Sequence, residues 1–172
     1  MEDWSEIDLK YQELVLEASK KSQDFDIENS DIDHAKFLSY LLVERAKHNI
    51  KIFTGSLKEL FYSDKRIQSA FKSLSDKVKV NIIIADGEGE SQDFIKFAKS
   101  KGFNIKKLSK SVKVKNHFLL SDDKAFRLEA VHDNNLIREN VKGIANFNSP
   151  SVVKKLAYVF DNELLNNVTD IK

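Results

Sequence analysis

The clearest β-strand in the sequence is Val78-Lys79-Val80-Asn81-Ile82-Ile83-Ile84-Ala85. Its second half is continuously apolar, which is typical of a parallel strand buried on both faces of a sheet. A second strand, Ile50-Lys51-Ile52-Phe53-Thr54, alternates in polarity and ends at the turn Gly55-Ser56. Apolar residues recur at helical spacing between the two strands, over residues 58–74. We therefore place the strand at residues 78–85 in the middle of a sheet with helices on its faces.

The remaining pattern extends this sheet. Helices are expected at residues 4–21 and 30–48. A further helix carries Phe94 and Phe97 and ends at Gly102, and the last one begins at Pro150 with Ser149 as its cap. Strands are expected at 103–108, at 113–120 and 125–131 as a hairpin around a polar turn, and at 141–147. The predicted fold class is α/β, a mixed sheet flanked by helices. We divide the chain into an N-terminal helix and linker (1–29) and a main domain (30–172).

Composition narrows the functional classes. The 172 residues are 41% hydrophobic, which suits one ordinary domain, and 28 Lys and Arg balance 27 Asp and Glu. Net charge therefore gives no reason to expect a polyanionic partner, and any electrostatic function must come from a local patch. The absence of Cys excludes disulfides and thiolate chemistry. No apolar segment is long enough to form the core of a signal peptide or to span a membrane. We expect a cytoplasmic protein without a membrane association.

Three segments together resemble one repeat of the phospholipase-D-like superfamily. They are Ala46-Lys47-His48-Asn49-Ile50-Lys51-Ile52-Phe53-Thr54, the hairpin Lys115-Asn116-His117-Phe118-Leu119-Leu120-Ser121-Asp122-Asp123-Lys124, and Phe147-Asn148-Ser149-Pro150-Ser151-Val152-Val153-Lys154-Lys155-Leu156 with Phe160. The resemblance covers residues 31–165 and implies the phospholipase-D-like fold, preceded here by an extra helix. It also implies a homodimer, because single-repeat members of that family pair through their motif faces.

The resemblance implies a catalytic HxKxxxxD motif in the hairpin, in which His attacks phosphorus, Lys holds phosphate oxygens and Asp orients the His. If His117 is the nucleophile, Leu119 stands at the Lys position and Lys124 at the Asp position. If Asp122 is the orienting acid, Lys115 stands at the His position and His117 at the Lys position. Neither register supplies the complete set, so His117, Lys115 and Asp122 remain candidates for a degenerate site. A hydrogen-bonded, partly buried structural role for His117 is the alternative that we favour.

Binding residues are expected on the hairpin and before it. Arg127 and Glu129 share one face of a strand, where we expect them to lie side by side as an ion pair or in a pocket that binds an anion. The sequence between Phe94 and Ser121 contains no acid but a run of lysines: Lys99, Lys101, Lys106, Lys107, Lys110, Lys113 and Lys115. Such a run either follows a phosphate backbone or protects a sheet edge from aggregation. No spacing of His and carboxylates specifies a metal site, and the sequence predicts no cofactor.

Three functions fit these residues. The first is a non-catalytic phospholipase-D-like domain that serves as a nucleic-acid-binding or partner-binding accessory, by analogy in a prokaryotic defence or mobile-element system. The second is a divergent homodimeric phosphodiesterase or nuclease that uses His117, with Lys115 as the phosphate cation. The third is a protein-interaction subunit whose first helix, at residues 4–21, docks on a partner.

Overall fold

A single eight-stranded sheet forms the centre of the molecule, in a computed structural model that describes residues 2–85, 91–109, 116–129 and 141–171. The strand order is β1-β7-β6-β5-β2-β3-β4-β8. The strands are β1 (Ile27–Asn29), β2 (Asn49–Thr54), β3 (Lys79–Ile84), β4 (Asn104–Leu108), β5 (Phe118–Ser121), β6 (Ala125–Glu129), β7 (Gly143–Asn146) and β8 (Val168–Asp170). Strands β2, β3 and β4 are parallel and all other pairs are antiparallel, which confirms the expected mixed sheet.

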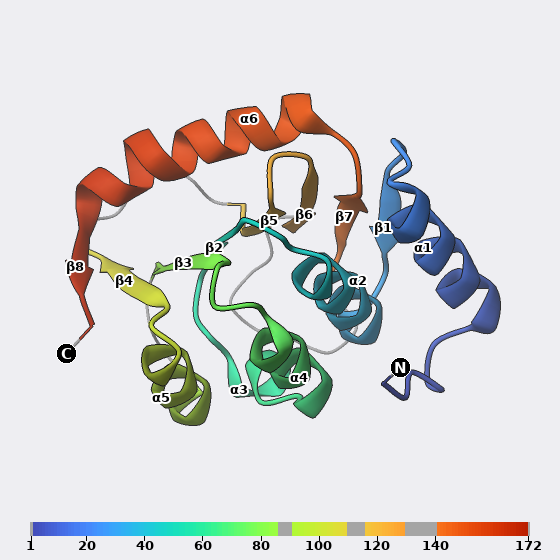
Figure 1. The fold of residues 1–172 in the computed structure, drawn as a ribbon, viewed down its shortest axis with the longest axis horizontal. Coiled ribbons are helices and arrows are strands. Elements are labelled where there is room, and N and C mark those ends of the chain that lie inside the picture. The colour runs from blue at the N-terminus through green and yellow to red at the C-terminus, as the bar shows by residue number, and fades with distance from the viewer. Residues whose placement is uncertain (1, 86–90, 110–115, 130–140, 172) are drawn as a thin grey trace.

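Helices cover both faces of the sheet (Figure 1). The helices are α1 (Leu9–Lys21), α2 (Ile32–Glu44), α3 (Glu59–Tyr62), α4 (Lys65–Ser73), α5 (Gln92–Ser100) and α6 (Pro150–Val159). In Figure 1, α6 crosses one side of the sheet, and α2, α4 and α5 lie on the other.

Central strand β3 contributes to the core on both sides of the sheet. Ile82 and Ile84 belong to the larger apolar cluster under α2, α4 and α5, whereas Ile83 packs into the cluster that contains Phe160 and Val153. This alternation follows from the period of two in a strand. It explains why the second half of β3 is apolar without interruption.

Two differences from the sequence-based expectation concern helices. The expected helix over residues 58–74 is split into α3 and α4, because the Asp64 side chain accepts a hydrogen bond from the Arg66 amide and caps a new helix start. After α6 the chain continues through a π-helical turn, Phe160–Leu164, and a 3-10 turn, Leu165–Asn167. Gly102 has φ +73, and therefore ends α5 as expected.

Two strands at opposite edges of the sheet were not predicted. Strand β1 lies in the segment that the sequence marked as a linker, and pairs Ile27 with Ala145 of β7. Strand β8 pairs with β4 at the other edge. The N-terminal segment also contributes Trp4, Ile7 and Val15 to the main core. Within the part of the chain that the structure describes, no helix is long and apolar enough to cross a membrane.

Candidate functional site

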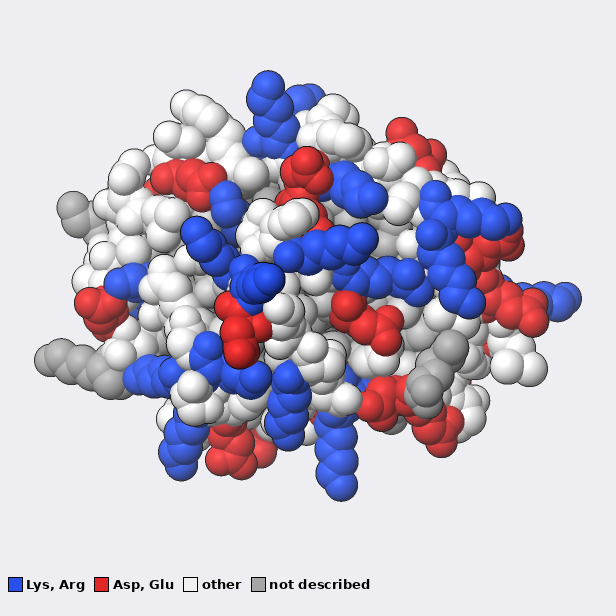
Figure 2. All heavy atoms as spheres, viewed as in Figure 1, with Lys and Arg blue, Asp and Glu red and all other residues white. Residues whose placement is uncertain are grey.

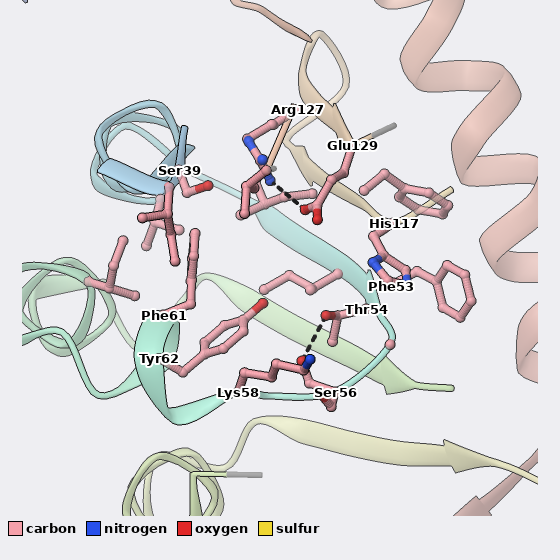
Figure 3. A pocket seen from close by; sticks show the side chains of 18 of the residues that line it. Ser39, Phe53, Thr54, Ser56, Lys58, Phe61, Tyr62, His117, Arg127 and Glu129 are labelled. Carbon is pink, nitrogen blue, oxygen red and sulfur yellow. Dashed lines mark hydrogen bonds and ion pairs between the residues drawn. The ribbon is translucent and has the colours of Figure 1, made fainter. Parts of the chain in front are cut away.

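A cavity of about 380 Å³ opens beside the carboxyl end of β2 (Figure 3). Residues from α2, α3, α4, β2 and the β5–β6 hairpin line it, and most of them are apolar. Among the described residues, its polar lining consists of Ser39, Tyr40, Thr54, Ser56, Lys58, Tyr62, His117, Arg127 and Glu129. The cavity thus combines an apolar wall with a few convergent polar groups, as small-molecule sites commonly do.

His117 lies at the start of the hairpin, directly before β5. Its imidazole stands edge-on to the ring of Phe53, with the ring centroids 6.0 Å apart. It also lies over Gly55, where a Cβ atom would come within 2.9 Å of the imidazole Cε1. Gly55 therefore provides the space that this imidazole occupies, and the ring faces the cavity (Figure 3).

Arg127 and Glu129 form the ion pair expected from their spacing, with 3.0 Å between Nη1 and Oε2. The Arg127 Nε donates to Oδ1 of Asn29 at 3.2 Å. The Arg127 side chain is only 7% exposed, and its Nη2 has no hydrogen-bond partner among the residues that the structure describes. A buried donor without a partner is uncommon and costs free energy unless a ligand or water completes it.

Tyr62 extends from α3 toward the Arg127–Glu129 pair (Figure 3). Burial raises the pKa of its hydroxyl well above the usual range, and the nearby Glu129 carboxylate raises it further, against the opposing effect of Arg127. The phenol is therefore neutral at physiological pH. It can act as a hydrogen-bond donor but not as a base.

Asp122 lies outside this cavity, at the other end of the hairpin strand. Its carboxylate accepts hydrogen bonds from the backbone amides of Lys47, His48 and Asn49, at 2.8–3.2 Å. Since β5 runs antiparallel to β2, Asp122 lies next to the first residue of β2 while His117 lies next to the last. Five residues of strand span roughly 16 Å. Asp122 thus holds the start of β2 and does not contact the His117 imidazole.

The lysine run lies largely on a different part of the sheet. Lys106 and Lys107 are on β4, separated from β2 by β3, and Lys106 forms an ion pair with Asp170 of β8. Lys99 donates to the backbone oxygen of Ile171, and Lys101 lies 3.8 Å from Asp76. On the face drawn in Figure 2, Lys and Arg side chains are interspersed with Asp and Glu. The candidates Lys110, Lys113 and Lys115 lie outside the described residues.

The structure brings His117, Arg127 and Glu129 together and leaves Asp122 and the β4 lysines elsewhere. It adds Asn29, Gly55 and Tyr62, which the sequence did not mark. The position of Gly55 after a strand was a turn signal only, and no local pattern could connect Asn29 to Arg127, 98 residues away. Among the described residues, no group of three or more His, Asp or Glu could hold a metal ion.

Comparison with solved structures identifies the fold as phospholipase-D-like. The chain is similar to Nuc from Salmonella typhimurium, a phospholipase D family member, with a TM-score of 0.63 at 14% identity over 87% of this chain and 99% of that one. NucT from Helicobacter pylori gives 0.61 at 14% identity, over 87% of this chain and 100% of that one. Polyphosphate kinase from Porphyromonas gingivalis gives 0.63 at 13% identity, over 96% of this chain and 30% of that one.

A DNA-binding protein has the same fold over most of this chain. TrmBL2 is an archaeal chromatin protein that shows a novel mode of DNA binding. It matches 94% of this chain with a TM-score of 0.59 at 15% identity. This chain spans 61% of the length of TrmBL2. No protein-family model and no curated protein sequence matches the chain.

Proposed function

We propose that this protein is a non-catalytic phospholipase-D-like domain that binds nucleic acid as an accessory protein. The observation that carries the proposal is the separation of His117 and Asp122 at opposite ends of β5, with the Asp122 carboxylate bonded to three backbone amides. The groups that a phosphoryl-transfer site would need do not converge in the hairpin.

Phosphoryl transfer requires fixed cations at the phosphate oxygens and an imidazole held in one tautomer. Arg127 is the cation of the hairpin that lines the cavity together with His117. It is already bonded to Glu129 and Asn29. At the two positions where the His117 register would need Lys and Asp, the chain has Leu119 and Lys124, and Lys124 bonds to Ser22. Loss of one charge-stabilising donor lowers rates by about a hundred- to a thousandfold, and loss of several would leave no useful turnover.

Nucleic acid is the preferred ligand for two reasons. TrmBL2 binds DNA and has the same fold over nearly the whole of this chain. The acid-free segment between Phe94 and Ser121 includes β4, which carries Lys106 and Lys107. Lys107 would contact a phosphate as a point charge, and Lys106 would exchange its exposed partner Asp170 for another. We further propose a cytoplasmic homodimer in a prokaryotic defence or mobile-element system, on the analogy of the fold.

The test is the salt dependence of binding to double-stranded DNA. Lys106→Glu combined with Lys107→Glu should weaken binding and reduce the slope of log K against log salt by about two, since each phosphate contact contributes about 0.9. A matched control, Lys154→Glu with Lys155→Glu on α6, changes the net charge equally and should leave the slope closer to that of the native protein. No binding at low salt, or equal losses in both variants, would refute nucleic-acid binding by β4 and favour a protein partner.

A divergent homodimeric phosphodiesterase is the second candidate, because His117 and Arg127 line one cavity. This function requires a second copy of the chain to supply the general acid. It predicts hydrolysis of a generic phosphodiester that disappears in His117→Ala. It also predicts that activity depends on protein concentration in the range where the dimer dissociates.

A further inference from the structure

The side of the sheet that α6 crosses is apolar at one end of the parallel strands and polar at the other. At the carboxyl ends, Ile83 of β3 and Leu108 of β4 pack into the apolar cluster with α6. Toward the amino ends, the same face carries Lys79, Asn81 and Asn104, which are exposed or half-buried. Central strands of a sheet with helices on both faces are usually apolar on both sides. The polar residues therefore mark an open part of this face.

The strand register arranges four of these side chains in a line. Asn81 of β3 lies directly opposite Asn104 of β4, and Ile83 lies opposite Lys106. Because side chains on one face are two residues apart, the order along a diagonal from β3 to β4 is Lys79, Asn81, Asn104, Lys106. We call these four residues the open-face line. Its ends are about 14 Å apart, at about 3.3 Å per residue and about 4.8 Å between strands.

The open-face line presents mainly hydrogen-bond donors. Asn104 Nδ2 donates to Asn81 Oδ1 at 3.0 Å, which holds the two amides side by side. The second N–H of Asn104, both N–H groups of Asn81 and the Lys79 ammonium have no acceptor among the residues that the structure describes. Lys106 is paired with Asp170, whose side chain is 83% exposed, and such a surface pair is easily exchanged. Donors of this kind suit phosphate oxygens, which only accept.

Two carboxylates close to the open-face line already have partners. Lys51 of β2 lies opposite Asn81, and its ammonium is bonded to both oxygens of Asp161 at 2.8 and 2.6 Å. Asn49, which lies opposite Lys79, is followed across the sheet by Asp122, whose carboxylate is bonded to backbone amides. Their charge is therefore largely compensated, and they leave the positive charge of Lys79 in place.

We propose that the open-face line binds the phosphate backbone of a DNA duplex. Lys79 and Lys106 contact phosphates at its two ends, and the amides of Asn81 and Asn104 donate to phosphate oxygens between them. A duplex carries one phosphate per about 3.4 Å of axis on each strand, so about 14 Å faces about four phosphates of one strand. None of the four side chains is aromatic, whereas sites for single strands stack bases on aromatic rings. This inference rests on the proposed function, and extends the contact from Lys106 across the sheet.

Fluorescence anisotropy with a short DNA duplex of mixed sequence, measured over a range of salt concentrations, tests the contribution of Lys79. Lys79→Gln should weaken binding and reduce the slope of log K against log salt by about 0.9, because one phosphate contact is lost. The matched control is Lys65→Gln, an exposed residue at the start of α4 on the other side of the sheet. It removes the same charge and should leave the slope unchanged.

The amides have a different signature, because they are neutral. Asn81→Leu combined with Asn104→Leu should weaken binding about ten- to a hundredfold at every salt concentration, since two hydrogen bonds are lost, and should leave the slope unchanged. Gln92→Leu, an exposed amide at the start of α5, is the control and should bind as the native protein does. Thermal melting of each variant shows whether it is folded.

The outcomes distinguish this inference from the function on which it rests. If the native protein binds the duplex and Lys106→Gln weakens binding, but folded Lys79→Gln and the double Asn variant bind as the native protein does, the open-face line is refuted and nucleic-acid binding stands. No binding of any DNA at low salt would refute both. Tighter binding of the single strand than of the duplex with the same sequence would refute the duplex as the ligand.

Discussion

Gly143 and Gly55 both lie where an added Cβ atom would be too close to a neighbour, but the neighbour is backbone at Gly143 and a side chain at Gly55. A Cβ atom at Gly143 would lie 2.6 Å from the backbone oxygen of Leu128, and one at Gly55 would lie 2.9 Å from the imidazole of His117. A backbone in the middle of a sheet cannot move aside, but an imidazole at a cavity edge can. Neither glycine needs a positive φ, so in both cases only space is at issue.

We therefore predict that Gly143→Ala lowers the free energy of unfolding by about 1–3 kcal/mol, as overpacking does, and that Gly55→Ala costs less. Urea denaturation measures both. The double variant Gly55→Ala with His117→Ala should be at least as stable as Gly55→Ala alone, because the clash is gone. An equal or smaller cost at Gly143 would show that β7 is not held against β6 as described.

Asp122 has a carboxylate that accepts hydrogen bonds from three backbone amides, and a backbone with φ +54. Substitutions can separate the contribution of the carboxylate from that of the backbone conformation. We expect Asp122→Gly, which tolerates this φ but loses the carboxylate, to lower the free energy of unfolding by about 1–3 kcal/mol. Asp122→Ala should cost about 1 kcal/mol more, since it adds backbone strain. Native stability of Asp122→Gly would contradict the structural role that we assign to this carboxylate.

At the scale of elements, α4 is joined to the N-terminal segment through Arg66. Its guanidinium lies 3.9 Å from the ring centre of Trp4, donates to the backbone oxygen of Asp3 at 2.8 Å and forms an ion pair with Glu6. Asp64, the cap of α4, binds this same Arg66 at 2.9 Å. The start of one helix and the position of the first residues of the chain are thus coupled.

This coupling predicts a specific pH dependence. Burial alone would raise the pKa of Asp64, but hydrogen bonds from Arg66 and Lys36 outweigh it and hold the pKa well below its usual range. A lowered pKa means that the stabilisation is complete above the unfolded value, about 4, and is lost as the pH falls below it. Asp64→Asn should therefore be less stable than the native protein at pH 7, and the difference should shrink below about pH 4. A difference that stays constant from pH 7 to pH 3 in denaturant titrations would refute this.

The N-terminal segment gives a second prediction at this scale. The chain without residues 1–29 would lose β1, the Asn29 contact of Arg127, and the buried side chains of Trp4 and Val15. We expect this truncated chain to be unfolded or to aggregate at 25 °C, because β7 would become an open edge and the core would be exposed. The same chain truncated only before Trp4 serves as the control. A cooperative melt of residues 30–172 alone would instead support the domain boundary drawn from the sequence.

The sequence predicted the long elements well and the short ones poorly. Strand β3 and α6 are marked by periodicity over several residues and by flanking turn residues, and they lie where expected. The hairpin is confirmed over β5 and β6, but β5 begins only at Phe118, and residues 113–115 and 130–131 of the expected strands lie outside the described residues. Strands β1 and β8 have three residues each, too few for a period to be recognised, and their pairing depends on β7 and β4 from distant parts of the chain. The split between α3 and α4 depends on one side chain that bonds to its own backbone.

The candidate site was predictable only in part, because most of its contacts join distant parts of the chain. The pairing of Arg127 with Glu129 follows from their local spacing, and the incomplete motif around His117 is visible in the sequence. The cavity requires three helices to pack beside β2, and the fixed orientation of Arg127 requires Asn29 from the opposite end of the chain. Contacts of this range have no signature in a single sequence.

The whole molecule has the phospholipase-D-like fold. The β5–β6 hairpin anchors the start of β2 through Asp122 and forms part of the wall of a cavity through His117 and Arg127. The function that we propose on this basis is binding and not cleavage.

Hydrolysis of bis(p-nitrophenyl) phosphate and of DNA tests whether this protein is catalytic, with native protein and His117→Ala measured side by side at concentrations high enough to sustain a dimer. We expect the native protein to release no more product than a blank without protein, and His117→Ala to do the same. Turnover by the native protein that disappears in a folded His117→Ala variant would contradict a non-catalytic function.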